Sequence, residues 1–356
     1  MNISNNITAP CLLIAAILVL ILFQSVFFTS GDVLYTETNE TSESNELSEP
    51  NPQSNFDQAT EAGEATESTD HYQDFISYNN IKYKPDRFFI LAVISNICAF
   101  LLPAVFYVKL KGAGYSKSLK FDMPKLKYLS LSVYMFFVLI SGSVLINSLM
   151  FYSGGGDANP DGVLPFLIQT GGNPVYDMGV LISFVVLPAL CEEFFFRSVL
   201  SAEYEKYGVF CAVMITSSAF AISHFSLKFF PSYFFAAAVL YFLAKITNSV
   251  LYAVILHAGY NFYSIYLWDK ILGVLKFEQN RVIFIFITAV IFMAFIAFTL
   301  NTLERIYYKK AYNNDPSPVN LPENKQKNAA VIRFFKSFLS PTFIAVIIIF
   351  FIYINI

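Results

Sequence analysis

Six polar side chains in otherwise apolar stretches are the part of this sequence that could carry out chemistry. An ionisable side chain in the middle of a bilayer costs roughly 2.5 to 3.5 kcal/mol, so such residues are candidates for a functional site. Together, carboxylates, imidazoles, a guanidinium and an amide supply the base, the positive group and the donors that general acid–base attack on a carbonyl requires. The six residues are Glu192, Glu193, Arg197, His224, His257 and Asn261.

The spacing of these residues gives them different expected tasks. Glu193 and Arg197 are i,i+4 neighbours with the acid before the base, which favours an ion pair on a helix. Glu192 points about 100° away from Glu193 on a 3.6-residue helix and is left for another role. His257 and Asn261 share one helical face.

A purely structural interpretation of each feature is open when the feature is taken alone. A Glu–Arg pair can hold a membrane bundle together, and a membrane histidine can serve as a hydrogen-bond partner between helices. Taken together the features favour a catalytic set, because two of the three histidines fall in apolar stretches and only His71 lies outside them.

The elements that must position these residues are apolar blocks of roughly 20 residues, the length that spans a bilayer as helix. The chain of 356 residues is 56% hydrophobic and 14% charged. We expect an all-α, polytopic transmembrane helical bundle of about nine helices with the catalytic site inside the bundle. The predicted helices are Cys11 to Phe28, Phe88 to Val108, Tyr128 to Tyr152, Met178 to about Leu200, about Val209 to Leu227, Pro231 to Ile246, about Val250 to Trp268, Val282 to Leu300 and Ser337 to Ile356.

The charges divide the chain into segments. Residues 1–30 hold an N-terminal membrane helix, and 31–86 form an acidic loop that we expect to be disordered and extracytoplasmic, with twelve acidic residues between Asp32 and Asp74. Residues 87–303 form the membrane core with the polar motifs at 176–267, 304–336 a basic cytoplasmic loop, and 337–356 a C-terminal membrane helix. Lysines between 109 and 127 and basic residues between 305 and 336 predict a multi-pass protein of the cell membrane with a cytoplasmic N-terminus.

The three polar segments read Glu-Glu-x-x-x-Arg, Phe-x-x-x-His and His-x-x-x-Asn, in this order on successive helices. This set resembles the CPBP family of intramembrane proteases, which includes CAAX prenyl proteases and bacteriocin-processing (Abi-type) enzymes. The resemblance covers about a quarter of the chain, roughly Tyr176 to Leu267. It implies an endopeptidase in which Glu192 and His224 activate a water molecule while His257 and Asn261 stabilise the oxyanion.

The resemblance leaves the catalytic type open. Members of the family are often called metalloproteases, and a zinc ion held by His224, His257 and Glu192 is one alternative. The sequence has no H-E-x-x-H, however, and its imidazoles lie on different helices, so we favour a metal-free glutamate mechanism. Glu193 paired with Arg197 would then orient the helix and tune the field of the site.

Two other functions remain open at this point. One is a non-catalytic immunity or scaffold module that binds a peptide, and the other is a proton-coupled transporter, although no internal repeat is evident. As partners we expect a membrane-associated peptide or protein substrate and the lipid bilayer, and no nucleic acid. One geometric difficulty also arises, since counting residues from the predicted loops puts Glu192 and His224 near opposite faces of the membrane.

Overall fold

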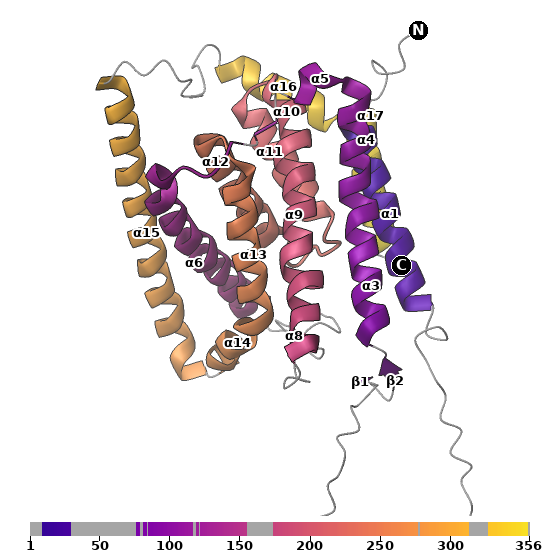
Figure 1. The fold of residues 1–356 in the computed structure, drawn as a ribbon. Helices are drawn as coiled ribbons and strands as arrows, with labels where there is room; N and C mark the ends of the chain where they lie inside the picture. The colour runs from indigo at the N-terminus through magenta and orange to yellow at the C-terminus, as the bar shows by residue number, and fades with distance from the viewer. Residues whose placement is uncertain are drawn as a thin grey trace, which may run out of the picture.

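The fold is a bundle of helices whose axes run mostly between two ends (Figure 1). The computed structural model describes residues 9–29, 76–78, 81–83, 85–116, 119–120, 122–154, 174–276, 278–312 and 327–354. We call the end where α5, α10 and α16 lie the upper end, and the end where α8 and α14 lie the lower end. The expected all-α bundle is confirmed, with one addition. An antiparallel hairpin pairs β1 (Ile76–Tyr78) with β2 (Ile81–Tyr83) inside the range predicted as a disordered loop.

The N-terminal part of the chain, up to residue 154, contributes three long helical runs. The first is α1 (Ala9–Thr29); the second joins α3 (Pro85–Asn96), the π-helical turn η2 (Ile97–Leu101) and α4 (Leu102–Lys111); the third joins η3 (Leu126–Tyr128) and α6 (Leu129–Gly154). The short helix α5 (Ala113–Ser116) lies between the second and third runs at the upper end. The acidic residues 32–74 lie outside the described residues.

The polar motifs lie on the helices that follow. One continuous run joins α8 (Pro174–Val180), the π-helical turn η4 (Leu181–Val186), α9 (Leu187–Glu193), the π-helical turn η5 (Phe194–Leu200) and α10 (Ser201–Glu205). After it come α11 (Val209–Ile222), α12 (Phe230–Thr247) and α13 (Val250–Tyr266). Each predicted motif therefore lies on, or directly after, its own helix.

The C-terminal part flanks the bundle. The short α14 (Trp268–Lys276) lies at the lower end, and α15 (Glu278–Tyr312) rises along α6 on one side. On the other side α17 (Pro341–Ile354) packs against α1, while α16 (Lys327–Phe338) lies across the upper end and packs on α11. Each of the nine predicted membrane helices thus corresponds to a helix or helical run among the described residues, whereas α5, α14 and α16 were not predicted.

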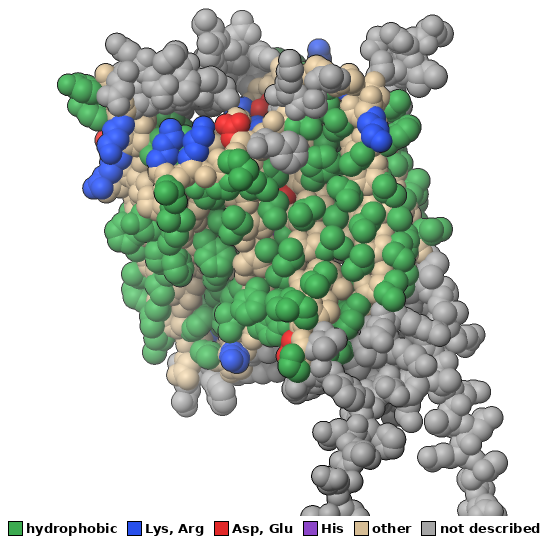
Figure 2. All heavy atoms as spheres, viewed as in Figure 1, with side chains coloured by type: hydrophobic (Ala, Val, Ile, Leu, Met, Phe, Trp, Pro, Cys, Tyr) green, Lys and Arg blue, Asp and Glu red, His purple; other side chains and the backbone are tan. Residues whose placement is uncertain are grey.

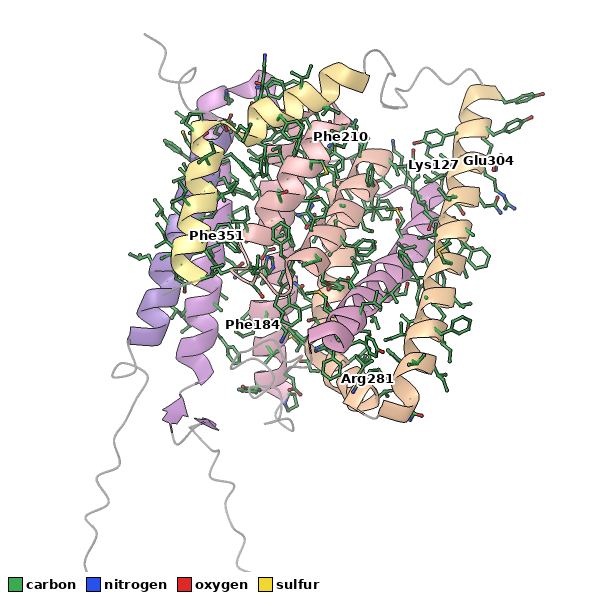
Figure 3. All side chains as sticks on the ribbon, turned by 180° about the vertical axis from the view of Figure 1, so that it is seen from behind. Lys127, Phe184, Phe210, Arg281, Glu304 and Phe351 are labelled. Carbon is green, nitrogen blue, oxygen red and sulfur yellow. The ribbon has the colours of Figure 1, made fainter. Side chains whose placement is uncertain are left out.

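The surface is that of a membrane protein. Within the described residues, five helical runs are long and apolar enough to cross a bilayer: Phe89–Lys111, Leu126–Tyr152, Tyr176–Glu205, Phe230–Thr247 and Asn280–Lys309. Figure 2 shows hydrophobic side chains covering the middle of the visible face, with Lys and Arg gathered mainly near the upper end. From behind, Lys127 and Glu304 lie near that end and Arg281 near the lower one, with Phe184 and Phe351 between them (Figure 3).

The difficulty over the depths of Glu192 and His224 disappears in this fold. The run that carries Glu192 continues to Glu205 at the upper end, beyond the predicted boundary at about Leu200. Glu192 is 13 residues from that end (205 − 192), or about 20 Å at 1.5 Å per residue. His224 is 15 residues past the start of α11 (224 − 209), or about 22 Å. The two residues therefore reach similar depths, because the run that carries Glu192 extends past its predicted boundary. The helix α11 also differs from the prediction, since it ends at Ile222 rather than Leu227.

A cluster of charged side chains connects α10 and α12 at the upper end of the bundle. The Glu205 carboxylate accepts from the ammonium of Lys120, from the Lys245 Nζ at 2.6 Å and from the Tyr241 hydroxyl at 3.2 Å. Burial lowers the pKa of the Lys120 ammonium, although the adjacent Glu205 carboxylate favours its charged form. The cluster joins α10, α12 and the segment before η3, and so fixes the ends of two helices that frame the site.

Candidate active site

The Glu193 carboxylate contacts two other members of the polar cluster, Arg197 and His257. Its Oε1 lies 3.0 Å from Nη1 of Arg197 and 2.8 Å from Nδ1 of His257. The three side chains are 0%, 1% and 3% exposed, so no water outside the bundle screens these charges. A buried ion pair needs such additional hydrogen bonds to offset the cost of removing both charges from water. The cluster therefore ties α9 and η5 to α13 by a charged hydrogen-bond network.

Arg197 is held by more than its carboxylate partner. Its Nη2 donates to the backbone carbonyl of Ala237 on α12 at 3.3 Å, and its guanidinium lies over the Phe220 ring with 4.6 Å between Cζ and the ring centroid. A planar guanidinium suits both contacts, because it can stack on an aromatic face while donating in its own plane. Arg197 therefore links the helix of the two glutamates to α11 and α12.

Glu192 faces away from this ion pair, as its position on the helix predicts. It is 8% exposed, and its Oε2 lies 3.9 Å from Nε2 of His257 without a hydrogen-bond partner among the described residues. Since Nδ1 of His257 is engaged by Glu193, Nε2 is the ring nitrogen left to face Glu192. A buried carboxylate oxygen without a partner is costly, so this oxygen is suited to receiving a water or substrate proton.

His224 lies just beyond the end of α11, on the turn toward α12. Its Nδ1 pairs with the backbone carbonyl of Phe220 at 2.9 Å, and its ring stacks on that of Tyr233 with centroids 4.0 Å apart. Directly after it, Phe225 adopts φ of 49°, the left-handed conformation that turns the chain. The Nδ1 contact leaves Nε2 as the nitrogen that could act on a reactant.

Asn261 lies one turn after His257 on α13. Its Nδ2 donates to the backbone carbonyl of Val185 at 3.3 Å, within the π-helical turn η4. An amide nitrogen has two hydrogens, so one remains for another acceptor. π-helical turns release backbone groups from the regular ladder and occur frequently at functional sites, and here two of them, η4 and η5, flank the two glutamates.

This arrangement lies within one segment that matches a known family. Residues 174–263 match the family described as type II CAAX prenyl endopeptidase Rce1-like. Over this segment the chain is similar to CAAX proteases. No curated protein and no solved structure matches the chain. The match covers all six candidate residues, and it confirms the resemblance on which the sequence-based prediction of a CPBP-type protease rested.

The matched segment brings the six residues together unequally. Glu192, Glu193, Arg197 and His257 contact one another or lie within 4 Å of a neighbour in the set. His224 joins them through the Phe220 ring, which lies 4.7 Å from its ring centroid and 5.6 Å from that of His257. The imidazole found beside Glu192 is therefore that of His257, whereas the resemblance implied a pair of Glu192 with His224.

Two aromatic residues of the candidate site were not assigned a role from the sequence. Phe220 is the aromatic residue of the Phe-x-x-x-His motif and contacts both imidazoles and the guanidinium, so the motif itself carried this signal. Tyr233 stacks on His224 from α12 and belongs to none of the three motifs. Nothing in its sequence context distinguishes it from the other 21 tyrosines of the chain.

The donor set of the site bears on the zinc alternative. Among the described residues, no group of three or more His, Cys, Asp or Glu side chains is placed to hold a metal ion. Nδ1 of His224 and of His257 is engaged, which leaves Nε2 of each ring, and Nε2 of His257 lies 3.9 Å from Oε2 of Glu192. Within the described part of the chain, no disulfide joins any of the four cysteines: Cys11, Cys98, Cys191 and Cys211.

Proposed function

We propose that this protein is an intramembrane endopeptidase that uses Glu192 as the base that activates water. The observation that supports this role is the contrast between two adjacent carboxylates. Oε2 of each carboxylate lacks a partner among the described residues, but Glu193 is neutralised by Arg197 and hydrogen-bonded by His257. The buried Glu192 forms no ion pair with a lysine or arginine of the described residues, and its Oε2 lies 3.9 Å from an imidazole nitrogen. Two carboxylates in different surroundings are typical of sites in which one reacts and the other positions.

The reaction proceeds by addition of water and expulsion of an amine. Glu192 takes a proton from a water molecule, and the hydroxide forms a bond to the scissile carbonyl carbon, which moves the carbonyl electron pair onto oxygen. As this pair returns, the C–N bond breaks, and the leaving nitrogen receives the proton held by Glu192. The products are a carboxylic acid and an amine, and Glu192 returns to its starting state.

The other residues of the site act on the oxyanion and on the water. Because Nδ1 of His257 donates to the Glu193 carboxylate, Nε2 carries a hydrogen only in the imidazolium form of the ring. This imidazolium and the free amide hydrogen of Asn261 are the proposed donors to the oxyanion, and each such donor contributes about 2.7 to 4 kcal/mol in well-studied enzymes. Glu193 fixes the ring of His257 through Nδ1, so we assign it as a positioning residue. His224 is proposed to hold the attacking water from the side of α11, as the family resemblance implies.

The substrate is proposed to be a membrane-associated peptide or protein, reached within the bilayer. The cell membrane and a cytoplasmic upper end are proposed on the distribution of charge. Lys109, Lys111, Lys125 and Lys127 precede α6 at this end, and Arg305, Lys309 and Lys336 lie near it on α15 and α16, as the positive-inside rule expects of the cytoplasmic side. With this orientation the chain crosses the bilayer with its N-terminus in the cytoplasm.

The test is cleavage by the purified protein in lipid nanodiscs. A pooled library of membrane peptides is incubated with wild type, Glu192→Gln and His224→Ala, each with and without a chelator, and products are identified by mass spectrometry. Cleavage that is lost in both variants and retained with chelator is the expected result. Cleavage lost with chelator would assign a metalloprotease, while peptide binding without cleavage would favour the immunity or scaffold alternative. Proton-coupled uptake of a solute would instead favour the transporter.

A further inference from the structure

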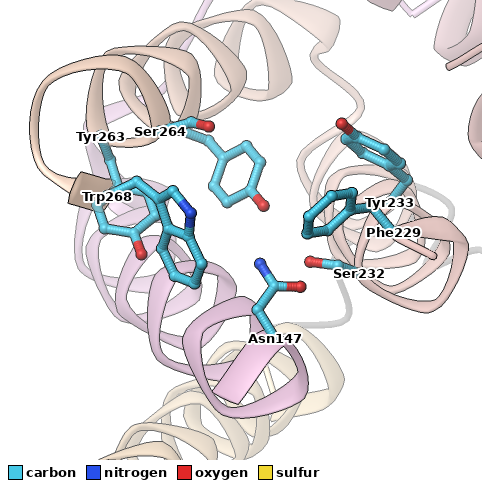
Figure 4. A pocket seen from close by; sticks show the side chains of 8 residues that line it. Asn147, Phe229, Ser232, Tyr233, Tyr263, Ser264 and Trp268 are labelled. Atoms are coloured by element: carbon cyan, nitrogen blue, oxygen red, sulfur yellow. The ribbon is translucent and has the colours of Figure 1, made fainter. Parts of the chain in front are cut away.

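A small pocket lies beside the candidate site, between α6, α12, α13 and α14. It has a volume of about 40 Å³, and Figure 4 shows Asn147 and Ser232 pointing into it from two different helices, α6 and α12. Its lining mixes aromatic rings with polar groups: Asn147, Phe229, Ser232, Tyr233, Tyr260, Tyr263, Ser264 and Trp268. None of the residues assigned to the reaction lines it.

Several buried polar atoms in the lining lack a protein partner. Oδ1 of Asn147, Oγ of Ser232 and the hydroxyl of Tyr263 accept or donate no hydrogen bond within the part of the chain that the structure describes. Ser232 is 2% exposed and Tyr263 5%. The Tyr260 hydroxyl lies near those of Ser143 and Ser232, but neither serine reaches hydrogen-bonding geometry. Because buried polar groups nearly always have partners in proteins, this concentration of unpaired groups indicates a polar occupant.

The size of the pocket decides what kind of occupant fits. A water molecule needs roughly 10 to 15 Å³ of such space and two to four polar partners. The pocket therefore has room for about three water molecules, and the three unpaired groups supply both donors and acceptors for them.

Two residues that line the pocket also lie next to residues of the candidate site. Tyr233 lines it and stacks on His224 at 4.0 Å, and Tyr260 lines it one turn after His257 and next to Asn261. The Tyr233 ring thus lies between water in this pocket and the His224 imidazole, which is proposed to hold the attacking water. In a bilayer such a source matters, because the hydrocarbon around the bundle supplies no water.

We infer that this pocket is a water site, which stores the hydrolytic water and delivers it past Tyr233 to His224 and Glu192. The inference rests on the proposed function. It adds Asn147, Ser232 and Tyr263 as residues that hold water for the reaction without touching the substrate. Removing one of these groups should slow the chemical step and leave substrate binding unchanged, because water is a reactant that the substrate does not bring.

The test combines a structural and a kinetic measurement on the full chain in nanodiscs. A structure that resolves ordered water should show water density in the pocket, reduced in Ser232→Ala. Ser232→Ala and Asn147→Leu should each lower kcat about tenfold with KM unchanged. The matched control is Ser148→Ala, since Ser148 is also fully buried and unpaired but does not line the pocket. It should keep the wild-type kcat. Melting temperatures verify that all variants fold.

The outcomes separate the water site from the proposed function. A dry pocket, or density for a peptide or lipid within it, overturns the inference even if the protein cleaves peptides. A raised KM with unchanged kcat also overturns it, because it makes the pocket a subsite for substrate. Equal kcat losses in Ser148→Ala and Ser232→Ala would show a general packing effect and refute it as well. Water density in a protein that cleaves no peptide would keep the water site and refute the proposed function.

Discussion

The Nδ1 of His257 lies 2.8 Å from Oε1 of Glu193, so the imidazole on α13 is held by the carboxylate that also pairs with Arg197. This contact fixes which ring nitrogen faces Glu192, and partners of this kind orient functional histidines in many sites. Glu193→Gln should therefore lower kcat by about 10- to 100-fold with little change in KM. Glu193→Asp should recover part of the loss.

The control for Glu193 is Glu304→Gln, an exposed glutamate on α15 that should leave kcat unchanged. Kinetics on one cleavable peptide check the prediction. A Glu193→Gln protein with wild-type kcat would show that the contact with His257 is structural only.

The ion cluster at the upper end should contribute to stability. Glu205→Gln removes the carboxylate and leaves Lys120 and Lys245 largely buried without their counter-charge, which costs about 3 to 5 kcal/mol. Asp122→Asn breaks a salt bridge between half-exposed side chains and should cost less than about 1 kcal/mol. Thermal unfolding in detergent compares the two variants. Equal melting temperatures would show that Glu205 is not needed for stability.

Close packing around α6 depends on a glycine. A Cβ on Gly142 would lie 2.4 Å from the Phe235 ring on α12 and 2.8 Å from the Phe292 ring on α15. Gly142→Ala should therefore destabilise the bundle by about 1 to 3 kcal/mol through overpacking. Gly273 on α14 has nothing within 4 Å, so Gly273→Ala is the matched control and should not lower the melting temperature. A stable Gly142→Ala protein would mean that α12 or α15 can shift away.

The sequence allowed the helices and the local pairs to be predicted, because both depend on neighbours along the chain. Apolar length located helices at the nine predicted positions, and the i,i+4 spacing predicted the contact of Glu193 with Arg197. The contact of Glu193 with His257 joins residues 64 apart, and no pattern in the sequence selects one glutamate over the other as its partner.

The unpredicted features have physical reasons too. The π-helical turns η4 and η5 leave no mark on a helix that is apolar on most sides. No glycine or proline within residues 223–227 signals that α11 has already ended. The amphipathic α16 was assigned to a basic loop because its lysines and arginine dominate the composition of that segment.

Cleavage by Glu192→Gln decides whether Glu192 is the base that activates water. Glutamine keeps the shape of the side chain but cannot take a proton, and general base catalysis contributes about 10²- to 10⁴-fold to the rate. On a peptide cleaved by wild type, and at an unchanged melting temperature, we predict that kcat falls by at least about 100-fold in this variant. A kcat within about threefold of wild type would show that Glu192 is not the base and would remove the basis of the proposed mechanism.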